Sequence, residues 1–256
     1  MKRLTIALMG TSALSAGAAT AAELNLICSA DVVICEKLVT EFEASHADTN
    51  VNMVRLSSGE AYAKIRAESR NPQTDLWWGG TGDPHLQAAA DGLTAEYESP
   101  MLDQLRDWAV KQAEVSGYRT VGVYSGALGW GYNTEIFAEK GITPPKCWAD
   151  LLDPSLKGEI EIADPNSSGT AYTALATLVQ LMGEDEAFTY LKALNENVVQ
   201  YTKSGSAPVK AAARGETGLG IVFQHDAVAQ AVEGFPIAVG SPCEGTGYEI
   251  GSMSIV

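Results

Sequence analysis

Residues 118–137 read YRTVGVYSGALGWGYNTEIF, a β-rich stretch with glycines at positions 122, 126, 129 and 131. The chain before it alternates short apolar runs, typical of buried strands, with segments whose apolar residues recur at helical spacing. These segments are LNLIC (24–28), VVICEKLVTEFEAS (32–45), VNMVRL (51–56), a helix from Glu60, DLWWGG (75–80) and HLQAAADG (85–92). Such alternation predicts a parallel sheet covered by helices on both faces. The stretch at 118–137 interrupts the alternation, and we predict one long strand here that crosses to a second lobe.

A second alternating series follows the crossing strand. Strands are expected at 159–164, 198–202, 218–223 and 236–242, two helices within 171–194, and further helices at 207–214 and 226–233. We therefore predict an α/β protein of two lobes with parallel-rich sheets, crossing strands as the hinge and a ligand cleft between the lobes. The expected boundaries are 23–123 for the first lobe, 124–235 for the second, a crossover near 118–134, and a return to the first lobe over 236–256. Because the chain ends inside the strand-like run GYEIGSMSIV, we expect that closing helices of the first lobe are missing.

The first 22 residues have the pattern of a secretory signal peptide. Lys2 and Arg3 precede an apolar core from Leu4 to Gly17, and small residues at 19–22 form a cleavage zone. The mature protein is therefore expected in the periplasm. Removing residues 1–22 takes away two positive charges and no acid, so the formal net charge changes from −15 to −17. Such a surface disfavours nucleic acid and anionic membranes as partners.

Four cysteines in an exported chain favour two disulfides. Three pairings are possible. Cys28 and Cys35 lie seven residues apart, at the end of the first strand and inside the next helix, which suits a local bond. We therefore predict Cys28–Cys35, with Cys147–Cys243 joining two distant segments. A metal site is disfavoured because the chain has no CxxC motif and no nearby histidine cluster.

Four short runs of Ser, Gly and Thr stand immediately before helix-like segments. They are Ser57-Ser58-Gly59, Gly80-Thr81-Gly82-Asp83, Ser167-Ser168-Gly169-Thr170 and Ser204-Gly205-Ser206. The start of a helix has unpaired N–H groups and a partial positive charge, so it attracts anions. Plain N-capping is the alternative interpretation of each run. Because all four follow strands of an α/β protein, where ligands bind, we predict a site for a small, oxygen-rich anion.

The expected ligand contacts are drawn from these runs, together with Ser29 directly after the first strand. We read Thr81 as a contact, and Asp83 as a structural helix cap with Pro84 at the first helical position. The candidate residues of this group are Ser29, Ser57, Ser58, Gly59, Thr81, Gly82, Ser167, Ser168, Gly169, Thr170 and Ser204.

Several motifs in the same order resemble a known family. They include LNLICSADVVICEKLVTEFE, SSGEAYAKIRAE, DLWWGGTGDPHLQAA, ADPNSSGTAYTALATLVQLMG and KAAARGETGLGIVFQHDA. The chain resembles the extracytoplasmic solute-binding proteins of ABC importers, in the ferric-iron-type cluster of the type II periplasmic binding protein fold. This resemblance implies a monomeric binding protein without catalysis or cofactor, and an ABC permease in the inner membrane as its partner. Members of the family continue beyond the point where this chain stops.

The resemblance also bears on the ligand. Ferric binders of the family hold iron with adjacent tyrosines after the strand that corresponds to GLGIVF, where this chain has Phe223-Gln224-His225-Asp226 and no Tyr-Tyr pair. Iron is thus disfavoured, although it stays the alternative ligand. His225 and Asp226, with Glu249, resemble the sugar contacts of relatives that bind hexose phosphates. A phosphonate such as aminoethylphosphonate would suit the same anion site.

Blander interpretations of these side chains stay open. His225 and Asp226 could be a cap pair, and Glu249 could be solvated. Trp78 and Trp130 could stack on a sugar or belong to the core, and His46 and His85 are expected on helix surfaces. An exported phosphatase is a weaker alternative function, because no GxSxG motif or evident nucleophile–base pair occurs.

Overall fold

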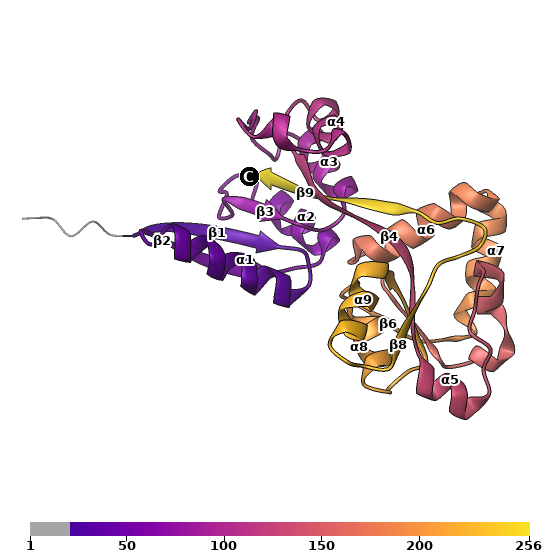
Figure 1. The fold of residues 1–256 in the computed structure, drawn as a ribbon. Helices are drawn as coiled ribbons and strands as arrows, with labels where there is room; N and C mark the ends of the chain where they lie inside the picture. Colours follow the sequence, from indigo (N-terminus) through magenta and orange to yellow (C-terminus); the bar gives the residue numbers. More distant parts are fainter. Residues whose placement is uncertain (1–20) are drawn as a thin grey trace, which may run out of the picture.

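The computed structural model describes residues 21–256, and the expected signal peptide therefore lies almost wholly outside the described residues. The first lobe begins with three strands that alternate with three helices, followed by a 3₁₀ turn and a further helix (Figure 1). Its elements are β1 (Ala22–Cys28), α1 (Val32–Ser45), β2 (Thr49–Arg55), α2 (Ser58–Ala67), β3 (Leu76–Trp78), α3 (Gly82–Ala90), the 3₁₀ turn η1 (Leu102–Gln104) and α4 (Asp107–Val115).

The crossing strand and the second lobe follow. The elements are β4 (Val121–Asn133), α5 (Thr134–Lys140), the 3₁₀ turns η2 (Trp148–Leu152) and η3 (Pro154–Leu156), β5 (Ile160–Ala163), α6 (Gly169–Met182), α7 (Glu184–Asn195), β6 (Val198–Thr202), α8 (Ala207–Ala213), β7 (Leu219–Phe223), α9 (Gln224–Val232), β8 (Ile237–Gly240) and β9 (Tyr248–Ile255). The predicted two-lobed α/β fold is confirmed.

The crossing strand predicted at 118–137 is β4, which pairs with different partners along its length. Its first part, Val121 to Ala127, pairs antiparallel with β9, and its second part, Leu128 to Asn133, pairs antiparallel with β7 and β8. The strand order is β2-β1-β3-β9-β4-β7-β5-β6, with β8 against β4. In Figure 1, β4 and β9 run between the two bodies of the molecule. These two strands therefore form the hinge, with β1–β3 on one side and β5–β7 on the other.

Two helices were not anticipated from the sequence, and both owe their position to local capping or packing. The stretch 118–137 ends not in a strand but in α5, because the Asn133 side chain accepts hydrogen bonds from the N–H groups of Glu135 and Ile136. Gly141, with φ of 65°, ends this helix in a left-handed conformation. Helix α4 packs against β4 in the first lobe.

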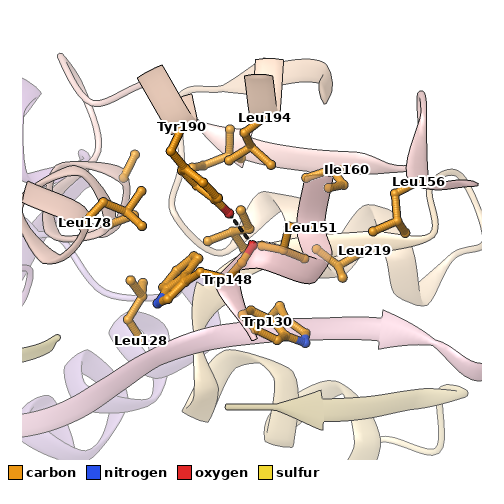
Figure 2. Close-up of a cluster of buried hydrophobic side chains, with 14 of the residues drawn as sticks. Leu128, Trp130, Trp148, Leu151, Leu156, Ile160, Leu178, Tyr190, Leu194 and Leu219 are labelled. Atoms are coloured by element: carbon orange, nitrogen blue, oxygen red, sulfur yellow. Dashed lines mark hydrogen bonds between the residues drawn. The ribbon is translucent and has the colours of Figure 1, made fainter. Parts of the chain in front are cut away.

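The core of the second lobe is built around three large aromatic side chains (Figure 2). Trp130 and Trp148 are fully buried and meet edge to face with ring centroids 5.5 Å apart. The Tyr190 hydroxyl donates a 2.6 Å hydrogen bond to the Trp148 carbonyl. Trp130 is thus a core residue and not a sugar platform. This packing fixes the second half of β4, and with it one end of the hinge.

Both predicted disulfides are present, Cys28–Cys35 and Cys147–Cys243. The first joins the end of β1 to α1, beside the expected ligand cleft. The second joins the start of η2 to the segment between β8 and β9. Within residues 21–256, no helix is long and apolar enough to cross a membrane.

Candidate functional site

A cavity of about 350 Å³ lies between the lobes, at the carboxyl ends of their strands. β1, β2 and β3 end immediately before its first-lobe residues, and β5, β6 and β7 end shortly before its second-lobe residues. This is the edge at which open α/β sheets bind ligands, because the loops there are free of the strand–helix packing. We call this cavity the cleft.

Ten of the fourteen candidate ligand residues line the cleft. They are Ser29, Ser57, Ser58, Thr81, Ser168, Gly169, Thr170, His225, Asp226 and Glu249. Their role as ligand contacts stays a prediction. The fold brings these residues together from both lobes and from the hinge strand β9.

The remaining four candidates lie outside the cleft lining. Gly59 and Ser167 touch one another, because the Gly59 N–H donates a 2.9 Å hydrogen bond to the Ser167 carbonyl. Gly82 borders a separate cavity near Gln112. Ser204 lies behind the lining and contacts the Ser206 hydroxyl at 3.3 Å, and it is Gly205 and Ser206 of the same run that face the cleft.

Hydroxyl groups from three helix starts meet at one side of the cleft. Ser58 begins α2, and its oxygen accepts a hydrogen bond from the Thr81 N–H, which precedes α3. Ser168 caps α6 by accepting from the Ala171 N–H. The Thr81 hydroxyl oxygen is buried and has no hydrogen-bond partner within residues 21–256. A buried hydroxyl without a partner is costly, so a ligand oxygen here would satisfy it.

Capping of a helix start does not exclude ligand binding by the same residues. Ser57 is the N-cap of α2, with the Glu60 carboxylate accepting from its N–H. This helix begins at Ser58, two residues before the predicted start. Thr81, and not Asp83, is the N-cap of α3, so the prediction of Asp83 as the cap was wrong. Asp83 lies in the first turn, where its charge suits the positive end of the helix.

Arg55 is a cleft residue that sequence reasoning missed. It ends β2, and its guanidinium donates to the Ala30 carbonyl at 3.1 Å and to the Ser57 hydroxyl at 3.0 Å. Among the residues that line the cleft it is the only Lys or Arg. The available signal was its position at the carboxyl end of a strand, directly before a Ser-Ser-Gly run. Asp31, Tyr124 and Ser125 line the cleft and were also missed, while Ser206 belongs to the predicted run Ser204-Gly205-Ser206, from which only Ser204 had been selected.

Two carboxyl groups and an imidazole form the other polar group of the cleft. His225 Nε2 lies 3.7 Å from Asp226 Oδ1 and 3.9 Å from Glu249 Oε1. These separations are too long for hydrogen bonds, and neither carboxyl receives one within residues 21–256. Glu249 is only 5% exposed, so its interpretation as a solvated residue was wrong.

Burial controls the protonation of this group. Burial raises the pKa of Asp226 to about 7, and the nearby negative charge of Asp31 acts in the same direction. Burial also raises the pKa of Glu249 well above its usual value, with Asp226 and Asp83 contributing. Partial desolvation lowers the pKa of His225, although 41% of its side chain is exposed at the cleft. Within residues 21–256, both carboxyl groups therefore keep unused acceptor oxygens at the cleft.

Tyr124 connects the two polar groups. Its hydroxyl oxygen accepts a 2.9 Å hydrogen bond from the Gly80 N–H, and its ring lies edge-on to His225. Burial, together with the charge of Glu249, raises the pKa of this phenol, so its O–H remains available as a donor. The ring also covers Gly251 of β9, where a Cβ would overlap it. Tyr124 is therefore held at the hinge with its hydroxyl in the cleft.

The predictions for the remaining aromatic and histidine residues had mixed outcomes. Trp78 lines the cleft, and His46 is exposed at the end of α1 as expected. His85 was expected on a helix surface and is instead fully buried. It stacks on Trp77 with ring centroids 3.6 Å apart and bonds to Ser254 and to the Gly79 carbonyl. Its helix turns this face toward the sheet, which the polar character of histidine did not indicate.

Comparison with known proteins identifies the family of this chain. A model of the bacterial extracellular solute-binding protein family matches residues 82–255. An uncharacterized protein of Haemophilus influenzae is 46% identical over 255 residues, which cover 97% of this chain and 73% of that protein.

Two solved structures are also similar. The periplasmic binding protein AfuA from Actinobacillus pleuropneumoniae, with exogenous fructose 6-phosphate bound, is 50% identical with a TM-score of 0.87, over 91% of this chain and 73% of that one. The periplasmic binding protein P5PA is 38% identical with a TM-score of 0.86, over 91% and 74% of the two chains. With its two-lobed fold, its hinge strands and its interlobe cleft, the chain belongs to the bacterial extracellular solute-binding protein family.

Proposed function

We propose that this protein is the periplasmic solute-binding component of an ABC importer and captures a phosphorylated small molecule, with a hexose phosphate favoured. The observation that carries the proposal is the division of one cleft into two polar groups of opposite character. Arg55 and the helix-start hydroxyls suit an anion, whereas Asp226 and Glu249 suit hydroxyl donors. A molecule with a phosphate and several hydroxyls meets both requirements. AfuA, at 50% identity, was solved with fructose 6-phosphate.

The phosphate would be held by neutral donors and one cation. The starts of α2, α3 and α6 supply N–H groups and a favourable dipole, and Ser58, Thr81 and Ser168 add hydroxyls. Arg55 supplies a full positive charge in a chain that is strongly acidic overall. A guanidinium can bind two phosphate oxygens with parallel N–H groups of its planar fork, whereas a lysine ammonium acts as a point charge.

The sugar would be recognised by its hydroxyl groups. Burial favours the protonated forms of Asp226 and Glu249, whereas hydrogen bonds donated by sugar hydroxyls would favour the charged carboxylates, which accept and do not donate. The pair would therefore select a ligand rich in O–H donors. An inorganic phosphate ion would leave both carboxyls without donors. We therefore expect discrimination between sugar phosphate and free phosphate as well as between sugar phosphate and free sugar.

Capture would proceed by closure of the two lobes about β4 and β9, with the ligand contacting residues of both lobes. The protein would then deliver the ligand to a permease in the inner membrane, and we expect it to act as a monomer and without catalysis. Residues 23–123 and 124–235 are the proposed lobes, with 236–256 returning to the first.

Titration calorimetry and a thermal-shift series test this function. The panel contains fructose 6-phosphate, glucose 6-phosphate, fructose, inorganic phosphate, aminoethylphosphonate and ferric citrate. Saturating hexose phosphate at a hundred times Kd should stabilise the protein by about 2.7 kcal/mol, with little effect of fructose or inorganic phosphate. Stabilisation by ferric citrate alone would contradict the proposal in favour of iron. Release of inorganic phosphate from the esters would contradict it in favour of a phosphatase.

A further inference from the structure

The two lobes contact each other directly beside the cleft, through the starts of two helices. Gly59, in the first turn of α2, donates its N–H to the Ser167 carbonyl of the second lobe at 2.9 Å. The Ser57 hydroxyl donates to the Lys203 carbonyl at 3.0 Å. In the opposite direction Gly169, the first residue of α6, lies against Ser58 and Thr81 of the first lobe. We call these reciprocal contacts of Gly59 and Gly169 the glycine contact.

The backbone conformation at Gly59 and Gly169 does not require glycine. Both have ordinary helical conformation, without a positive φ, so an alanine would be accepted locally and has the higher helix propensity. What excludes a side chain is the opposite lobe. A Cβ on Gly59 would lie 2.6 Å from the Asn166 carbonyl oxygen and 3.0 Å from that of Ser167. These are backbone atoms, which cannot rotate away.

The same holds for Gly169 from the other side. A Cβ there would lie 2.9 Å from the Ser58 hydroxyl oxygen and 2.7 Å from Thr81 Cγ2, and closer still to the Thr81 hydroxyl oxygen. The neighbours are buried side chains with little room to move, because Ser58 is 4% and Thr81 2% exposed. At each glycine, the atoms that a Cβ would overlap therefore belong to the opposite lobe.

We infer that Gly59 and Gly169 are positioning residues for lobe closure, whose missing side chains allow the starts of α2 and α6 to meet when the ligand is enclosed. The inference rests on the proposed function and deepens it. Gly59 does not line the cleft, so its effect on affinity would pass through closure alone. Gly169 does line the cleft, and its substitution adds a direct effect on the ligand.

Alanine variants test the inference by separating closure from folding. Gly59→Ala and Gly169→Ala should bind fructose 6-phosphate at least about tenfold more weakly, because closure is opposed by a clash. Their ligand-free thermal midpoints should equal or exceed that of the unaltered protein, since alanine favours the helices. Gly218→Ala is the matched control, because its Cβ would crowd Glu159 and Phe137 within the second lobe only, and its affinity should stay within twofold.

Hydrogen exchange at residue 59 gives a direct readout of closure. In the unaltered protein, saturating fructose 6-phosphate should slow exchange of the Gly59 N–H, which bonds across the lobes. In Gly169→Ala that protection should be lost, although residue 59 is unchanged, while amides in the interior of α2 keep theirs. A merely structural defect of α2 would affect the whole helix.

The results that would contradict this inference differ from those that would contradict the proposed function. If fructose 6-phosphate does not bind the unaltered protein, that proposed function is wrong. The inference is then judged by ligand-free exchange at residue 59, which Gly169→Ala should still accelerate. Affinity within twofold of the unaltered protein in both variants would overturn the inference, as would equal exchange at residue 59 in all forms.

Discussion

Asp31, which lines the cleft, forms an ion pair with Lys210 of α8 that joins the two lobes. Asp31 caps α1, where one oxygen accepts from the Val33 N–H, and its other oxygen accepts from the Ser206 hydroxyl of the second lobe. Burial by itself raises the pKa of Asp31, but the hydrogen bonds from Lys210 and Val33 outweigh it and lower the pKa. Asp31 therefore stays charged, and its charge disfavours ionisation of Asp226.

Asp226→Asn should stabilise the protein at pH 8 while weakening its binding. Burial raises the pKa of Asp226 to about 7, whereas an unfolded aspartate titrates near 3.8. Between these values the folded state holds a proton that the unfolded state has released, so the contribution of Asp226 to stability falls as pH rises from about 4 to 7. Asparagine cannot titrate, and we expect a gain of about 2 kcal/mol at pH 8.

Urea denaturation of both proteins at pH 4 and pH 8 measures this effect. The gain should shrink toward pH 4, where folded Asp226 keeps its proton and the unfolded aspartate, titrating near 3.8, is only partly ionised. Asp185→Asn, at an exposed position on α7, is the control and should change stability little at either pH. Affinity for fructose 6-phosphate should fall at least about tenfold, because asparagine offers fewer acceptor sites. Equal stabilities at pH 8 would show that Asp226 ionises normally.

Arg55→Met should remove the positive charge expected to bind phosphate. The loss of a charge-assisted contact is expected to weaken fructose 6-phosphate binding by about 1.5–3 kcal/mol, or roughly ten- to a hundredfold. Calorimetry at two salt concentrations should also show a weaker salt dependence than in the unaltered protein. Arg214→Met is the control, because Arg214 pairs with Glu216 on the exposed surface. An unchanged affinity would exclude Arg55 from the phosphate site.

Acid should weaken the protein partly through His85. Burial lowers the pKa of His85 to about 3, while an unfolded histidine titrates near 6.5. Between these values only the unfolded state binds the proton, so the His85 contribution to stability falls as pH is lowered from about 6.5 to 3. His85→Asn should cost about 1–3 kcal/mol at pH 7 through the contacts with Ser254 and Gly79.

The diagnostic comparison is the slope of stability against pH. Between pH 6.5 and 4, His85→Asn should lose less stability than the unaltered protein, whereas the exposed His46→Asn should follow it. Parallel slopes for all three proteins would mean that His85 takes up a proton in the folded state. Denaturant titrations at four or five pH values provide the slopes.

The two disulfides should differ in their effect on stability. In the chain-entropy model, Cys147–Cys243, which spans 96 residues, contributes about 4–5 kcal/mol, and Cys28–Cys35, which spans seven, contributes about 2–3 kcal/mol. Paired alanine substitutions at each bond, compared by guanidinium denaturation, measure the difference. The opposite order would indicate that the packing of Cys28 and Cys35 beside the cleft outweighs loop closure.

Much of the architecture could be predicted from the sequence. Strand–helix alternation, the glycine-rich crossing strand near Tyr124 and the pairing of the cysteines depend on neighbours within a few residues or on simple separation. Helix α5 was missed because the cap at Asn133 was read as the continuation of a strand, and α4, which packs against β4, was not predicted either. The position of the site was predictable for a related reason, because the carboxyl ends of parallel strands meet at one edge.

Which side chains face the cleft was decided only by tertiary structure. A helix rotates each successive residue by 100°, so Ser58 points into the cleft, whereas Gly59 meets the other lobe. His85 is buried because its face of α3 turns toward Trp77 and β9. Glu249 lies against His225 because β9 returns from the second lobe. The sequence by itself therefore determined most of the elements, the disulfide pairing and the sheet edge at which the cleft lies, since these follow from periodicity, spacing and strand direction. The orientation of side chains across the cleft depends on packing between separate elements, several of them far apart in the sequence.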